Sequence, residues 1–124
     1  MDQIQRRLDA IGFGDKHRRR LELYRPLVDH AIAGIVAADF ERAFLIHPPL
    51  RESVAPVSEA IHMAEAEHFR RLFTGIFDDA YVASMDRLCQ RERQANVRTR
   101  ARVSIAFALL RAIGLASRRR ALLS

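Results

Sequence analysis

Five histidines and one cysteine are the side chains of this 124-residue chain that most often hold a transition metal. No two histidines lie four residues apart, the spacing that puts two imidazoles on one face of a helix. His62 and His68 come closest, but six residues of helix turn them to different faces. Cys89 has no second cysteine for a disulfide or a multi-cysteine site. We therefore expect no metal site built from side chains alone.

The acidic residues and the cysteine offer little for catalysis. Asp78 and Asp79 are adjacent, and because adjacent side chains on a helix diverge, helix capping explains them better than acid–base chemistry. Cys89 in the middle of a helical pattern is typical of a small buried hydrophobe. The sequence has no glycine-rich phosphate loop, nucleophile elbow or His-Glu-x-x-His element. We do not expect an enzyme.

Arginine supplies a different chemistry, the binding of anions. The formal net charge is +6, and residues 1–62 balance 9 basic against 9 acidic residues, so the excess lies in 63–124. Four arginines there recur at roughly helical steps: Arg87, Arg91, Arg98 and Arg102. Such a ridge can bind nucleic-acid phosphates, but it can also be a solvated helix face or anchor an acidic partner. Without a recognition-helix motif, nucleic acid is the weaker interpretation.

The elements that position these residues are helical, because apolar residues recur at helical spacing along nearly the whole chain. A short N-terminal stripe is stopped at Gly12, and Asp15 is expected to cap the stretch that follows. Pro26 predicts a helix start or a junction, with a helix over 26–44. The run His47-Pro48-Pro49 ends that helix.

Three further helices are predicted in the second half. The first begins near Ser58 and ends at Gly75, the second runs from Asp78 or Asp79 to about Gln94, and the third from about Val97 to Ser117. The inward face of the first comprises Ile61, Ala64, His68, Leu72 and Phe73. The centre of the last, Val103–Leu110, is apolar all round, so more than one partner must cover it.

The length fits one all-α domain over 1–124, with 1–14 as an N-terminal pre-helix. No apolar run approaches the roughly 20 residues that a membrane span needs. The N-terminus also lacks the uninterrupted apolar centre of a signal peptide. A cytoplasmic protein is therefore expected.

Two regions share a pattern with a known family. The first region is an element of His68, Leu72, Phe73 and Gly75, followed by Asp78, Asp79 and Tyr81. The second region is residues 11–40, in which five residues keep the spacing of the family pattern: Pro26, Leu27, Val28, Ile35 and Val36. Together these regions resemble the globin-coupled sensor and protoglobin family. The resemblance implies a globin-like helical bundle that serves bacterial signal transduction and normally binds haem.

The departures from the family pattern fall at the haem positions. The register carried over from the family puts the proximal haem histidine at Glu92 and the distal tyrosine at Phe40. A carboxylate is a poor replacement for an imidazole on haem iron, and phenylalanine offers no hydrogen-bond donor. The aromatic residues expected early in the following helix are also replaced, around Ala101 and Arg102. The usual haem site is therefore not expected.

The family fold implies one more helix after the last predicted one. Either the chain is truncated from a longer transducer with a downstream signalling domain, or the last predicted helix is covered by a second copy. Family members dimerise through their final helices, so the resemblance implies a homodimer in the second case. We expect its contact residues to be Val103, Phe107 and Leu110.

Three functions remain open. The first is a degenerate sensory or regulatory globin domain without usual haem binding, in which Phe40, His68 and Glu92 line or close the former pocket. The second is a haem-based oxygen or redox sensor with an altered axial ligand, for which His68 is the best choice. The third is an arginine-rich helical module that binds nucleic acid or an acidic partner.

Overall fold

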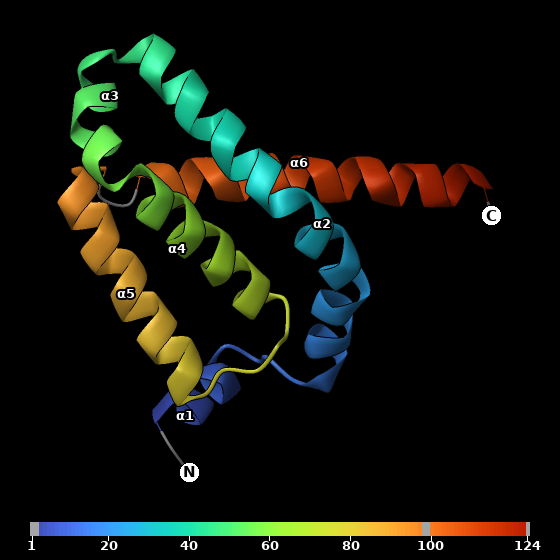
Figure 1. Cartoon of the computed structure of the whole chain (residues 1–124). Coiled ribbons are helices and arrows are strands. Elements are labelled where there is room, and N and C mark those ends of the chain that lie inside the picture. Colours follow the sequence, from blue (N-terminus) through green and yellow to red (C-terminus); the bar gives the residue numbers. More distant parts are fainter. Residues whose placement is uncertain (1–2, 98–99, 124) are drawn as a thin grey trace.

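The computed structural model describes residues 3–97 and 100–123, and every regular element in these ranges is helical. In chain order the elements are α1 (Gln3–Ala10), α2 (Asp15–Ile46), α3 (Pro49–Val54), the 3-10 turn η1 (Ala55–Val57), α4 (Ser58–Leu72), α5 (Asp79–Ala95) and α6 (Arg100–Leu123). The predicted all-α fold is confirmed. Helix α2 packs against α4 and α6, and α4 packs against α5 (Figure 1).

Helix α2 runs without interruption through Pro26, so the predicted helix start or junction at that residue was wrong. Proline lacks the N–H that would bond to the preceding turn and its ring crowds that turn, so the helix bends rather than ends. Figure 1 shows α2 changing direction between its blue and cyan parts. Every fully buried residue of α2 follows the bend, from Val28 to Phe44. The part after Pro26 therefore contributes most to the core.

The start of α2 also differs from the prediction. Gly14, not Asp15, is the N-cap residue, and its N–H donates to Nδ1 of His17 at 3.1 Å. Asp15 lies in the first turn, where its carboxylate is 2.9 Å from the Arg18 guanidinium. An acidic residue in the first turn interacts favourably with the helix dipole.

Prolines end α2 and begin the next helix. His47 terminates α2 as predicted, but the short helix α3, which we had not predicted, starts at Pro49. A proline in the first helical turn is tolerated because its missing N–H would have no intrahelical acceptor there. The two prolines predict only the end of a helix, whereas Pro49 also begins one.

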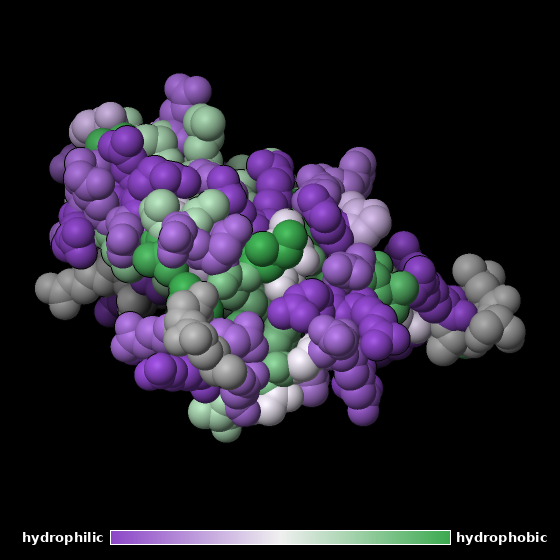
Figure 2. Space-filling view, turned by 90° about the horizontal axis from the view of Figure 1, so that it is seen from below, coloured by the Kyte–Doolittle hydropathy of each residue, from purple (hydrophilic) through white to green (hydrophobic). Residues whose placement is uncertain are grey.

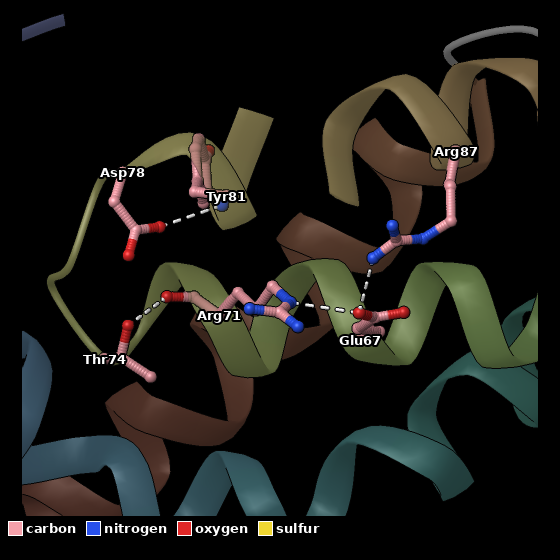
Figure 3. A network of polar contacts seen from close by, with 6 residues as sticks. All are labelled: Glu67, Arg71, Thr74, Asp78, Tyr81 and Arg87. Carbon is pink, nitrogen blue, oxygen red and sulfur yellow. Dashed lines mark hydrogen bonds and ion pairs between the residues drawn. The ribbon is translucent and has the colours of Figure 1, made fainter. Parts of the chain in front are cut away.

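Helices α4 and α5 form an antiparallel pair joined by the loop of residues 73–78. Gly75 adopts a φ of +71°, and a Cβ there would lie 2.5 Å from Cγ of Arg18. Glu67 on α4 accepts hydrogen bonds from Arg71 and from Arg87 on α5, each at 3.0 Å (Figure 3). Asp78 caps α5, accepting from the N–H of Tyr81 at 3.0 Å. The predicted capping role is thus confirmed for Asp78, while Asp79 lies in the first turn.

Helix α6 continues to Leu123, beyond the predicted end at Ser117. The residues after Ser117 are mainly arginine, alanine and leucine, which favour helix, and no glycine or proline stops them. Two hydrogen bonds join α6 to α2: Ser104 to the Asp39 carboxylate, and the hydroxyl groups of Ser117 and Tyr24, 2.5 Å apart. The C-terminal end of α6 extends beyond the other helices (Figure 1).

The described core is formed by residues from α2, α3, α4, α5, the α5–α6 connection and α6. Its fully buried large apolar residues include Ile32, Phe40, Val54, Ile61, Leu88 and Ile105. On the face seen in Figure 2, hydrophobic surface (green) is divided by hydrophilic side chains (purple). No helix in the described ranges is long and apolar enough to cross a membrane.

Replacing Asp78 by alanine should lower the free energy of unfolding by about 1 kcal/mol, because the N–H of Tyr81 loses its acceptor at the start of α5. Chemical denaturation followed by circular dichroism measures the change. Asp79→Ala is the matched control, since Asp79 is not the capping residue. An equal loss in both variants would contradict the capping role.

Candidate functional site

A cluster of buried polar side chains lies where α4, α5 and the start of α6 meet. Glu65 and His68 come from α4, Glu92 from α5 and Arg102 from α6. The exposed fractions are 0% for Glu65, 6% for His68 and 2% for Glu92. The side chain of Arg102 is 22% exposed. Charged groups are rarely buried to this degree unless they are paired.

The pair of Glu92 and Arg102 is the centre of this buried cluster. Nη2 of Arg102 donates to Oε1 of Glu92 at 2.7 Å, and Nε donates to Oε2 at 3.2 Å. The contact is bidentate, because the planar guanidinium donates to both oxygens of the carboxylate. Nη2 also lies 3.6 Å from Sγ of Cys89 on α5. The pair fixes the start of α6 against α5.

Glu65 adds a second carboxyl group beside the pair. Burial is the largest cause, and together with the negative charge of Glu92 it raises the pKa of Glu65 to about 9. The positive charge of Arg102 lowers the pKa of Glu65 but does not outweigh these two effects. Neither side-chain oxygen of Glu65 has a hydrogen-bond partner within the described residues. Glu65 therefore stays protonated at neutral pH.

His68 completes the cluster as a neutral imidazole. Its ring centroid lies 4.9 Å from that of Phe69 and 6.1 Å from that of Tyr81. Burial, and then the charge of Arg102, lowers the pKa of His68 to about 4. Nδ1 is buried without a hydrogen-bond partner in the described part of the chain. His68 packs among aromatic rings, beside the ion pair.

Phe40, the third residue predicted for the former pocket, is only 2% exposed but has different neighbours. Its ring centroid lies 4.7 Å from that of His62 and 6.2 Å from that of Phe44. It borders a cavity of about 530 Å³ between α2, α3 and the start of α6. Neither His68 nor Glu92 lines this cavity. The structure thus brings His68 and Glu92 into one cluster and places Phe40 in another environment.

The arginine ridge predicted from the sequence is not present as one face. Arg102 points inward to Glu92, and Arg87 binds Glu67. Arg91 donates to the side chain of Gln94 at 3.1 Å. Arg98 lies outside the described residues. The ridge prediction was wrong because helical spacing alone does not show which arginines meet a buried acid.

The three predicted contact residues on α6 are all exposed. Val103 is 53%, Phe107 68% and Leu110 61% exposed, whereas Ile105 and Leu109 on the opposite side are buried. Exposure makes these three residues available for a partner. It does not identify the partner, and dimerisation remains a prediction.

Two members of the cluster, Glu65 and Arg102, were missed as site residues. The signal for Glu65 was its spacing: it lies four residues after Ile61 and three before His68, on the inward face of α4. A glutamate in that register predicts a buried carboxyl group that requires a partner. Arg102 was noted only as a replaced aromatic residue and as part of the ridge.

Comparison with known families decides the identity of this helical bundle. The family model described as Protoglobin matches residues 1–117. The chain belongs to the protoglobin family. No curated protein and no solved structure matches it.

Membership of the protoglobin family implies haem, but the residues present do not fit that group. The register carried over from the family assigns the proximal position to Glu92, whose two oxygens are both engaged by Arg102 within a buried cluster. The same register assigns the distal position to Phe40, which has no donor for a bound gas. An ion pair thus lies at the position that the resemblance assigns to the iron ligand.

Removing the guanidinium should cost much stability. Arg102→Met leaves the carboxylate of Glu92 buried without a counter-charge, so the free energy of unfolding should fall by roughly 3–5 kcal/mol. Urea denaturation at pH 7 measures it. Arg87→Met is the control, because the Arg87–Glu67 pair is exposed and worth less than about 1 kcal/mol. The double variant Glu92→Leu/Arg102→Met should recover most of the lost free energy of unfolding, because no unpaired charge remains buried. A double variant as unstable as Arg102→Met would contradict the pairing.

Glu65 makes stability depend on pH in a defined direction. Its pKa is about 9 in the folded chain against 4.5 as the ordinary value, so the folded state retains a proton that the unfolded state releases. Stability should therefore fall as pH rises from about 4.5 to about 9. Glu65→Gln, whose side chain at this position is neutral at every pH, should be more stable than the wild type at pH 8. Its stability should also change less with pH across this range.

Thermal denaturation at several pH values tests this dependence. Glu67→Gln is the control on the same helix: its ion pairs with Arg71 and Arg87 lower the pKa of Glu67, so its loss should not stabilise the chain at pH 8. A parallel pH profile for wild type and Glu65→Gln would show that Glu65 does not hold the proton.

Proposed function

We propose that this protoglobin is a sensory or regulatory domain of bacterial signal transduction that does not hold haem in the family's usual way and acts through protein–protein contacts. The observation that supports the proposal is the bidentate hydrogen bonding of Arg102 to Glu92. This ion pair neutralises the buried carboxylate at the position that the resemblance assigns to the iron ligand. The proposed role is regulatory rather than catalytic, since the cluster offers a closed ion pair and not a reactive group facing a cavity.

Through the same ion pair, a structural change in the interior can be transmitted to α6. Arg102 lies near the start of α6 and contacts α5, while the cavity of about 530 Å³ is bordered by Phe40, Ala101 and Ser104 from α2 and α6. A small apolar ligand in this cavity, or a change at the N-terminal helix, would shift the start of α6. The exposed side of α6 would then present Val103, Phe107 and Leu110 differently to a partner.

A second function, haem sensing with an altered ligand, has one observation in its favour. The imidazole of His68 is neutral, buried and has an unpartnered Nδ1, which is the form that binds iron. Against it, His68 packs edge-on against Phe69 and does not line the large cavity. We therefore retain haem through His68 as the outcome that would overturn the first proposal.

Titration of the purified chain with haemin separates the two functions. We expect no saturable Soret shift, because Glu92 is held by Arg102 and the cluster has no free imidazole facing a cavity. His68→Ala is measured in parallel. A one-to-one Soret complex that is lost in His68→Ala would establish the altered-ligand sensor in place of the regulatory domain proposed here.

A further inference from the structure

Three exposed apolar residues of α6 form a narrow stripe, and two others, Leu115 and Leu122, lie apart from it. Val103, Phe107 and Leu110 are spaced by four and three residues, so they lie on one line along the helix. All three are more than half exposed. A stripe with this spacing is the seam by which one helix packs along another, and it is narrower than the apolar face of a helix that lies on a membrane.

A row of arginines borders one side of this stripe. Arg100, Arg111 and Arg118 are separated by 11 and 7 residues, about three and two helical turns, so they share one face of α6. At about 100° per residue this face is adjacent to Phe107. All three arginines are exposed, and none forms an ion pair with another described residue. The row is therefore available for a counter-charge from outside the chain.

A second copy of α6 does not supply that counter-charge. The sequence contains no aspartate or glutamate after Glu92, so two α6 helices would bring only arginines to their contact. In an antiparallel pair the two arginine rows would face each other, which opposes association. The charge thus argues against an antiparallel homodimer through this face, although the apolar stripe alone would permit it.

Nucleic acid fits the face less well than a helix does. Phosphates would meet the arginines, but Val103 and Leu110 in the centre of the face offer nothing to a phosphate backbone. Only Phe107 among the three could stack on a base. A partner helix uses both features, because its apolar residues pack on the stripe while its carboxylates face the arginine row.

We propose that α6 binds an acidic amphipathic helix of another protein, which packs leucine-like residues on Val103, Phe107 and Leu110 and places glutamate or aspartate opposite Arg100, Arg111 and Arg118. This inference rests on the proposed function, since it names the kind of partner through which the regulatory domain acts. The partner helix would cover the side of α6 that the described helices leave exposed.

The probe is a synthetic peptide of about four heptads with leucine at the core positions and glutamate at the flanking ones. Its binding to the full chain is followed by fluorescence anisotropy at low and at physiological salt. We expect binding that weakens with salt and falls about tenfold in Arg111→Glu/Arg118→Glu. Arg19→Glu/Arg20→Glu changes the net charge equally, at exposed positions of α2, and should leave the affinity unchanged.

The proposal is wrong if the acidic peptide does not bind, or if a peptide with lysine in place of glutamate binds equally well. It is also wrong if the two charge-reversed variants lose equal affinity, or if light scattering shows a stable dimer that Phe107→Asp disrupts. Anionic vesicles and duplex DNA are tested with the same variants, and tighter binding to either would also exclude the helical partner. The haemin titration is independent of all these results, so failure of the partner proposal is distinguishable from failure of the proposed function.

Discussion

Arg102 is the one cation that the described structure places against two buried carboxyl groups, and the arrangement of three helices depends on it. Its bond to Glu92 joins α6 to α5, and its charge partly offsets the repulsion between Glu92 and Glu65 on α4. An ion pair with this little exposure is stable only when both partners are present. The buried polar residues of the three helices thus hold each other in place.

This arrangement explains how a carboxylate is accommodated at residue 92. Glu92 alone would be a buried charge of high free energy. With Arg102 opposite it, and with Glu65 protonated, the cluster carries no net charge, so the three helices can pack closely around it. Glu92 on α5 and Arg102 near the start of α6 therefore form one structural unit, because each residue is the partner of the other.

The sequence predicted the class of fold and the positions of most helices, because apolar spacing and proline or glycine determine these locally. It did not predict the continuity of α2, since whether Pro26 bends or ends a helix depends on tertiary packing on both sides of it. For the site, burial of His68 and Glu92 followed from the family register. The inward direction of Arg102 and the protonation of Glu65 did not, because both depend on contacts between residues distant in the sequence.

The two hydrogen bonds between α2 and α6 restrict how α6 can move. Ser104 and Ser117 are thirteen residues apart, about 20 Å along the helix, and their partners Asp39 and Tyr24 lie on opposite sides of the bend in α2. Because these bonds hold α6 on both sides of the bend, α6 spans the bend. The two parts of α2 therefore cannot change their angle at Pro26 while both bonds remain.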